Sequence, residues 1–145
     1  MVEALSEEKA EIKMLTLEEA NALLPQVRSI LKSLRDLRDR VLRIQAQIEI
    51  EEMTGLGSDG RLTPAAQNAV TAQMDEFQVH TNQFENLLEE LFQLGAHLKD
   101  LNRGLIDFYS LRDEEVVFLC WIEGESEIQH WHTIEGGFQS RQSLD

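Results

Sequence analysis

The stretch LIDFYSLRDEEVVFLCWIEGESEIQHWHTI, Leu105–Ile134, decides the fold class because its apolar residues alternate with a period of two. This pattern predicts three short strands, over about residues 105–110, 115–122 and 126–133, joined by short turns as a β-meander. Both faces of the middle strand are apolar, which indicates a central strand that is covered twice. We expect helices to form one cover, with a partner chain as the candidate for the other.

The chain before this stretch carries the 3.6-residue period of amphipathic helices. The pattern predicts helices over residues 16–53 and 63–101, separated by a loop rich in Gly, Ser and Asp. Thr16 and Glu19 form a capping box, Thr63 before Pro64 marks the second helix start, and Pro25 predicts a kink or a fresh start. The expected fold class is therefore α+β: a long antiparallel two-helix hairpin followed by a three-stranded antiparallel β-meander.

The predicted hairpin is longer than a compact domain of this size requires. At 1.5 Å per residue its second helix would span about 55 Å, which leaves apolar surface uncovered. A second copy is the simplest cover, so we expect a homodimer that forms through the helices. The acidic residues 1–15 predict a flexible arm, and residues 16–145 a single domain.

Composition excludes several classes of function. The net charge of −14 opposes binding to nucleic acid phosphates, although residues 25–48 are locally basic. We interpret that basic segment as the partner of a neighbouring helix rather than as an RNA or membrane patch. No apolar run of about 18 residues and no leader pattern occurs, so we expect a cytoplasmic protein without membrane contact. No P-loop, dinucleotide-binding glycine fingerprint or nucleophile elbow occurs either, so no motif implies a cofactor.

Three segments, TLEEANALLPQVRSIL, LKDLNRGLIDF and LCWIEGESEIQHWHTIEGGFQSRQ, together resemble the bacterial family catalogued as domain of unknown function 2203. The likeness runs in matching order from Leu15 to Leu144, and it brings no established activity with it. The positions that the resemblance implies are Lys99, Asp100, Gly104, Asp107, Phe108, Cys120, Trp121, Gly124, Glu125, Trp131, His132, Glu135, Gly137, Phe138 and Arg141. His132 belongs to this pattern, whereas His130 does not.

Two side-chain types in the C-terminal third can carry chemistry. His130 and His132, two apart on a strand, project to one face and can hold a metal ion, with Asp107, Glu135 or His97 as the third ligand. The competing interpretation is a half-buried face shared with Ile128, without metal. Cys120 can be a nucleophile with His132 as its base, or a buried inert thiol, and its apolar neighbours favour the inert thiol.

The remaining candidates form a polar set near the two tryptophans. The candidate ligand-binding residues are Asp107, Trp121, Glu125, His132, Glu135 and Arg141. Such a set suits either a small-molecule pocket or a salt-bridge knot that closes the tail over the strands. The sequence assigns no catalytic residue. The function we expect is a non-enzymatic dimeric assembly or interaction module; the alternative is a small-molecule or metal-binding protein, enzymes included, with its site around His132, Asp107, Glu135 and Arg141.

Overall fold

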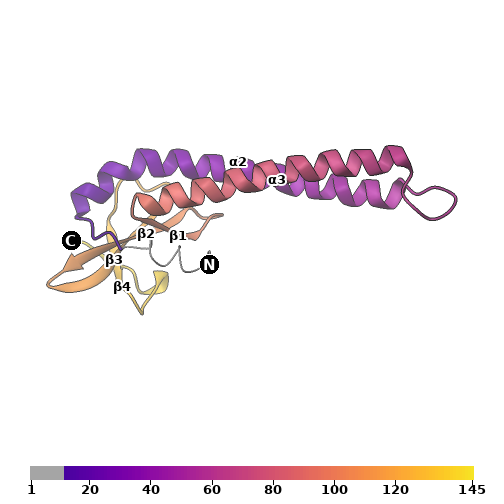
Figure 1. Ribbon diagram of the computed structural model, residues 1–145. Helices are drawn as coiled ribbons and strands as arrows, with labels where there is room; N and C mark the ends of the chain where they lie inside the picture. The colour runs from indigo at the N-terminus through magenta and orange to yellow at the C-terminus, as the bar shows by residue number, and fades with distance from the viewer. Residues whose placement is uncertain (1–11) are drawn as a thin grey trace. The chain divides into compact units, whose positions relative to one another are not determined.

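The computed structural model describes residues 12–145, so residues 1–11 of the predicted arm lie outside the described part. Two helices, α2 (Leu17–Thr54) and α3 (Pro64–Gln93), precede an antiparallel sheet in which the strands are neighbours in chain order (Figure 1). The strands are β1 (Ala96–Asp100), β2 (Leu105–Arg112), β3 (Glu115–Ile122), β4 (His130–Thr133) and β5 (Gln142–Ser143), with the short helix η1 (Phe138–Ser140) before the last. The predicted α+β class, with two helices followed by an antiparallel sheet, is confirmed.

The chain divides into two compact units. The hairpin unit, Lys32–Glu89, contains the end of α2, the loop, and most of α3, and the two helices run antiparallel side by side (Figure 1). Its buried apolar residues include Leu34, Ile44 and Val70. The sheet unit contains the described residues up to Leu31 and from Glu90 onward. Within residues 12–145, neither helix contains an apolar stretch long enough to cross a membrane.

Both predicted helix starts are confirmed by their capping hydrogen bonds. The backbone N–H of Thr16 donates to Glu19 Oε1 at 2.8 Å, and the backbone N–H of Glu19 donates to Thr16 Oγ1 at 3.1 Å. At the second start, the backbone N–H of Ala66 donates to Thr63 Oγ1 at 3.2 Å. Pro25 lies inside α2, which continues through it as one helix.

The second helix ends earlier than the sequence predicts. α3 stops at Gln93, and the prediction of a helix to residue 101 is wrong. Gly95 has a φ of 97°, a left-handed conformation that glycine adopts easily and that commonly ends helices. Its N–H donates to the carbonyl of Phe92 at 2.9 Å, and the chain then enters β1. The apolar residue Leu98 continues the helical spacing in the sequence but belongs to this strand.

The sheet has five strands where the sequence predicts three. The predicted strands correspond to β2, β3 and β4, although β4 begins only at His130. β1 lies in the segment for which the sequence predicts the end of the second helix. β5 has only two residues and pairs with β4, where Ser143 lies opposite His130. Two residues are too few to show an alternating pattern, so β5 has no signal in the sequence.

β3 is buried on both faces, as predicted. Each of residues 117–121 is at most 5% exposed. On one face α2 contacts the sheet, where the guanidinium of Arg28 lies 5.4 Å from the ring of Trp121. The other face carries Cys120, which is 0% exposed. Because this burial arises within a single chain, no partner chain is needed to cover β3.

Candidate functional site

Strand register brings three side chains together on one face of the sheet. Asp107 of β2 lies opposite Cys120 of β3, and His132 of β4 lies opposite Phe118, two residues before Cys120. Because side chains two apart on a strand share a face, Asp107, Cys120 and His132 all project to the same side. They are 3%, 0% and 2% exposed, respectively, so the cluster is closed to solvent.

His132 is held between two acceptors. Its Nδ1 lies 2.8 Å from the carbonyl oxygen of Thr133, which can only accept, so Nδ1 carries a proton and donates it. Its Nε2 lies 3.1 Å from both carboxylate oxygens of Asp107. Without a cation between them, the lone pair of Nε2 and the lone pairs of the Asp107 carboxylate would face and repel each other. An ionised Asp107 therefore requires either a second proton on His132 or a metal ion at Nε2.

Cys120 completes the cluster as a protonated thiol. Burial, and next the charge of Asp107, raise the pKa of the Cys120 thiol to about 12, and the thiol also hydrogen-bonds to the Asp107 carboxylate. At neutral pH it is therefore no nucleophile, in agreement with the expected buried thiol. One ligand atom from each of Cys120, Asp107 and His132 lies within 4.8 Å of the others.

A second polar group ties the C-terminal tail to the sheet. Arg141 Nη2 donates to Glu125 Oε2 at 2.8 Å and Oε1 at 2.9 Å, and to His130 Nδ1 at 2.9 Å. Glu125 is fixed in turn, because its Oε1 accepts the backbone N–H of Ile122 and its carbonyl accepts the indole N–H of Trp121. The Arg141 side chain is only 14% exposed. We name Arg141, Glu125 and His130 the tail knot.

A third histidine lies beside the cluster on the edge strand. His97 of β1 is opposite Asp107, and its ring makes edge contacts with the rings of Phe92 at 5.3 Å and Tyr109 at 4.9 Å. Burial, and next the charge of Lys99, lower the pKa of His97 below its ordinary value of 6.5. The ring is therefore neutral at physiological pH, and it packs as an aromatic side chain.

The predicted site residues fall into separate places. Asp107 meets His132, whereas Trp121, Glu125 and Arg141 meet in or beside the tail knot. Glu135 lies exposed in the turn after β4, and within residues 12–145 no hydrogen bond or ion pair joins it to either group. His130, a predicted metal ligand, instead accepts from Arg141. For Cys120 the sequence favours a buried inert thiol over a nucleophile. The alternation of the predicted central strand could have placed it on the cluster face, but its position opposite Asp107 follows only from the register.

Comparisons with known proteins bear on family alone. Neither the curated proteins nor the solved structures contain a match to this chain. A family model does match residues 13–144, which is nearly the whole sequence, and its description is "Uncharacterized conserved protein (DUF2203)". The resemblance seen in the three sequence segments is thereby confirmed, and the chain belongs to the DUF2203 family of uncharacterized conserved proteins.

Proposed function

We propose that this protein binds a zinc ion between Asp107, Cys120 and His132. The observation that carries the proposal is the buried set of three ligand atoms, all within 4.8 Å of one another. A tetrahedral zinc ion with oxygen, nitrogen and sulfur ligands separates those atoms by roughly 3.3–3.6 Å. His132 Nε2 and the Asp107 oxygens are already 3.1 Å apart, so a small movement of the Cys120 thiol would complete the geometry.

The surroundings of His132 support the same proposal. Histidines that bind metals usually donate their other N–H to a carbonyl or carboxylate, which fixes the ring and its tautomer. The Nδ1 bond to the Thr133 carbonyl does this, and it points the lone pair of Nε2 at Asp107. A metal ion would then supply the positive charge that the facing nitrogen and carboxylate need. Mixed sulfur, nitrogen and oxygen donors suit Zn²⁺ better than Mg²⁺ or Ca²⁺.

The position of the ligands indicates what the metal would do. They come from three neighbouring strands, β2, β3 and β4, and each is at most 3% exposed. A metal ion there would cross-link the strands, and its binding free energy would add to the folding free energy. The proposed role is therefore a sheet stabilised by zinc, rather than a zinc ion that acts on a large substrate.

The test is metal analysis of the purified chain, followed by titration with Co²⁺. We expect about one zinc per chain, and a sulfur-to-cobalt charge-transfer absorption when Co²⁺ replaces it. Cys120→Ser should abolish that absorption, and Asp107→Asn and His132→Ala should abolish stoichiometric binding. His130→Ala is the matched control, because His130 lies two residues away on the same face but belongs to the tail knot.

Circular dichroism of each variant keeps the result interpretable, since a variant that fails to fold would also fail to bind. Cys120→Ser changes a single atom and is the variant on which the conclusion rests. A folded wild-type chain with no bound metal and no cobalt absorption would show that the cluster is a buried hydrogen-bonded group without an ion.

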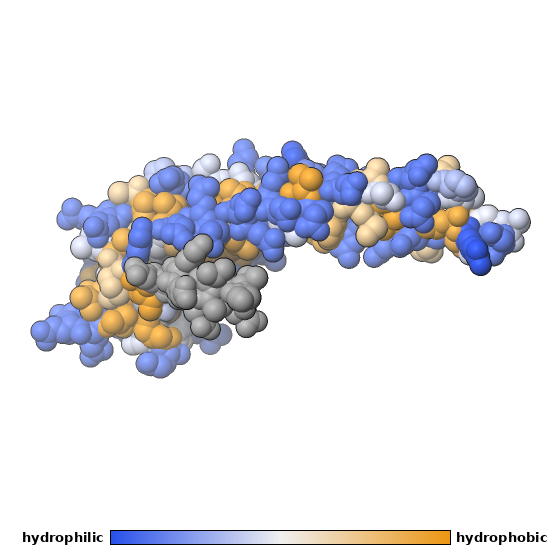
Figure 2. Space-filling view, viewed as in Figure 1, coloured by the Kyte–Doolittle hydropathy of each residue, from blue (hydrophilic) through white to orange (hydrophobic). Residues whose placement is uncertain are grey.

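A second proposal concerns assembly: we propose a homodimer that forms through the hairpin unit. Leu42, Ile50 and Met53 are 55%, 58% and 77% exposed, and their spacing of eight and three residues puts them on one side of α2. In Figure 2 apolar side chains lie at the surface of the helices between polar ones. Two hairpins that bury these side chains would make a four-helix bundle, which supports the expected assembly module.

Light scattering tests the assembly at several protein concentrations. We expect the mass of two chains for the wild type, and of one chain after Leu42→Glu with Met53→Glu. Gln47→Glu is the control, because Gln47 is exposed on α2 but is polar and does not belong to this apolar set. A wild-type mass of one chain throughout would refute the dimer.

A further inference from the structure

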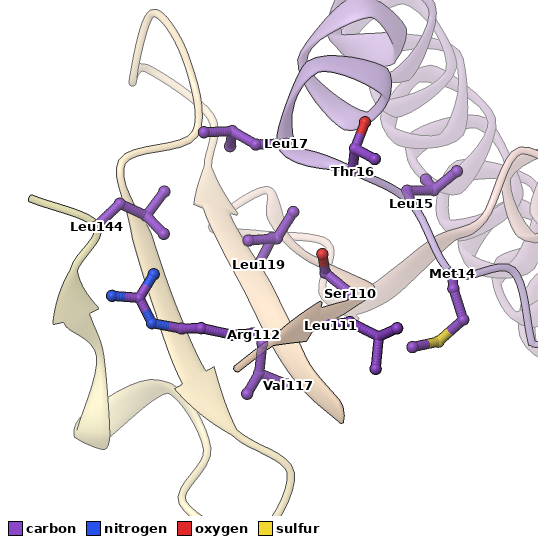
Figure 3. A pocket seen from close by; sticks show the side chains of 10 residues that line it. All are labelled: Met14, Leu15, Thr16, Leu17, Ser110, Leu111, Arg112, Val117, Leu119 and Leu144. Atoms are coloured by element: carbon purple, nitrogen blue, oxygen red, sulfur yellow. The ribbon is translucent and has the colours of Figure 1, made fainter. Parts of the chain in front are cut away.

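An apolar pocket of about 420 Å³ lies in the sheet unit (Figure 3), and none of its lining residues is a ligand of the proposed zinc site. Its apolar walls include Leu15, Leu17, Val117, Leu119 and Leu144. Ser110 and Val117 are opposite each other in the β2–β3 register, and alternation turns them to the face opposite Asp107 and Cys120. The pocket is therefore a separate feature on the other side of the same strands.

Three polar side chains line this pocket: Thr16, whose hydroxyl caps α2, and Ser110 and Arg112, which come from the end of β2. The hydroxyl of Ser110 points between Leu15 and Leu119, and Arg112 extends its guanidinium toward Leu144 (Figure 3). The guanidinium carbon of Arg112 lies over the ring of Trp131, 4.7 Å from the ring centroid. Among residues 12–145 it forms no ion pair, although the chain carries a net charge of −14. An unpaired cation beside an apolar pocket is complementary to an anion with an apolar tail.

The contact with Trp131 leaves donors of Arg112 available. Within residues 12–145 the guanidinium makes no hydrogen bond or ion pair, so its N–H groups can donate to a ligand. Two parallel N–H donors match the two oxygens of a carboxylate, which gives a bidentate and charge-assisted contact. The anion that fits best is therefore a planar carboxylate.

We infer that this pocket binds a medium-chain carboxylate, with its apolar chain against the leucines and its head group on Arg112. The size of the pocket sets the chain length. A protein cavity of about 150 Å³ holds benzene, so a pocket of this volume has room for roughly 12–17 non-hydrogen atoms. Carboxylates of about 10–12 carbons fall in this range.

The experiment titrates the full chain with hexanoate, octanoate, decanoate and dodecanoate, by calorimetry and by tryptophan fluorescence. Trp131 reports on the site because it lies under Arg112. The affinity should rise by about fourfold for each added methylene until the pocket is full. Decanol, which has the same chain without the charge, should bind at least about tenfold more weakly than decanoate.

Arg112→Gln should weaken decanoate binding by about tenfold or more and leave decanol binding unchanged. Arg112→Lys keeps the charge but loses the planar fork, so it should weaken decanoate several-fold; it also decides the matter if Arg112→Gln fails to fold. Arg61→Gln is the control, since Arg61 is an exposed arginine in the loop of the hairpin unit. The inference is overturned if no carboxylate of the series binds, if decanol binds as tightly as decanoate, or if both Arg112 variants bind decanoate like the wild type.

Discussion

Replacing Arg141 with alanine should lower the melting temperature by about 10 °C without any ligand present. The side chain makes two charge-assisted bonds to Glu125, at 2.8 and 2.9 Å, and one to His130 at 2.9 Å. Removing one partner of a buried ion pair costs about 3–5 kcal/mol, and the 22% exposure of Glu125 reduces this to about 3 kcal/mol. For a chain of this length, about 1 kcal/mol corresponds to roughly 3 °C.

The assay is thermal unfolding followed by circular dichroism, with Arg103→Ala as the matched control. Arg103 and Arg141 both stack on the ring of Phe138, at 4.4 and 5.0 Å, but only Arg141 belongs to the tail knot. The control should lose about 2 °C, because an exposed cation–π contact is worth about 0.5–1 kcal/mol. If Arg141→Ala melts like the control, the knot is not structural, and Arg141 would be better explained as a ligand-binding residue.

Three further predictions concern single residues. Glu114 has a φ of 69° in the β2–β3 turn, a conformation that glycine adopts more easily, so Glu114→Gly should stabilise the fold by about 0.5 kcal/mol. Glu115→Gly, inside β3, should destabilise the fold, and urea unfolding measures both changes. The pKa of the Cys120 thiol is raised to about 12 from 9.0, so in metal-free protein its contribution to the free energy of unfolding is fully present below about pH 9 and is lost as pH rises toward 12. Cys120→Ala should therefore lose less stability at alkaline pH than the wild type does. Iodoacetamide at pH 8 should label the thiol only when urea unfolds the chain. The pKa of His97 is lowered in the folded state, so the unfolded chain binds a proton at this histidine more readily than the folded chain does. Acidification below pH 6.5 should therefore destabilise the wild type more than His97→Gln, and parallel acid-unfolding curves for the two proteins would contradict this.

Much of the architecture follows from local patterns. The capping residues Thr16 and Thr63 set the helix starts, because each can bond the free N–H groups at its own helix end. The run around Cys120 predicts a doubly covered strand, because apolar side chains on both faces are stable only when both are buried. These features depend on neighbours a few residues apart, so a single sequence shows them.

The end of α3 shows where such patterns fail. Leu91 and Leu98 are seven residues apart and suit one helical stripe, yet Gly95 between them takes a left-handed conformation and the chain turns into β1. Glycine permits either outcome, since it can also occur inside a helix at a modest cost. Pairing of β1 with β2, with His97 opposite Asp107, decides between the two, and that pairing is a tertiary contact.

The sequence by itself determined the fold class, the helix starts and the central strand, and it singled out Asp107, His132, Glu125 and Arg141 as polar residues in an apolar region. Only the tertiary structure sorted them into two groups, with Cys120 and Asp107 joining His132 and with His130 joining Arg141. The physical reason is register: a shift of one residue between β3 and its neighbours would turn Cys120 to the opposite face and separate the three ligand atoms. Composition and spacing cannot fix that register, because it depends on how the whole sheet packs.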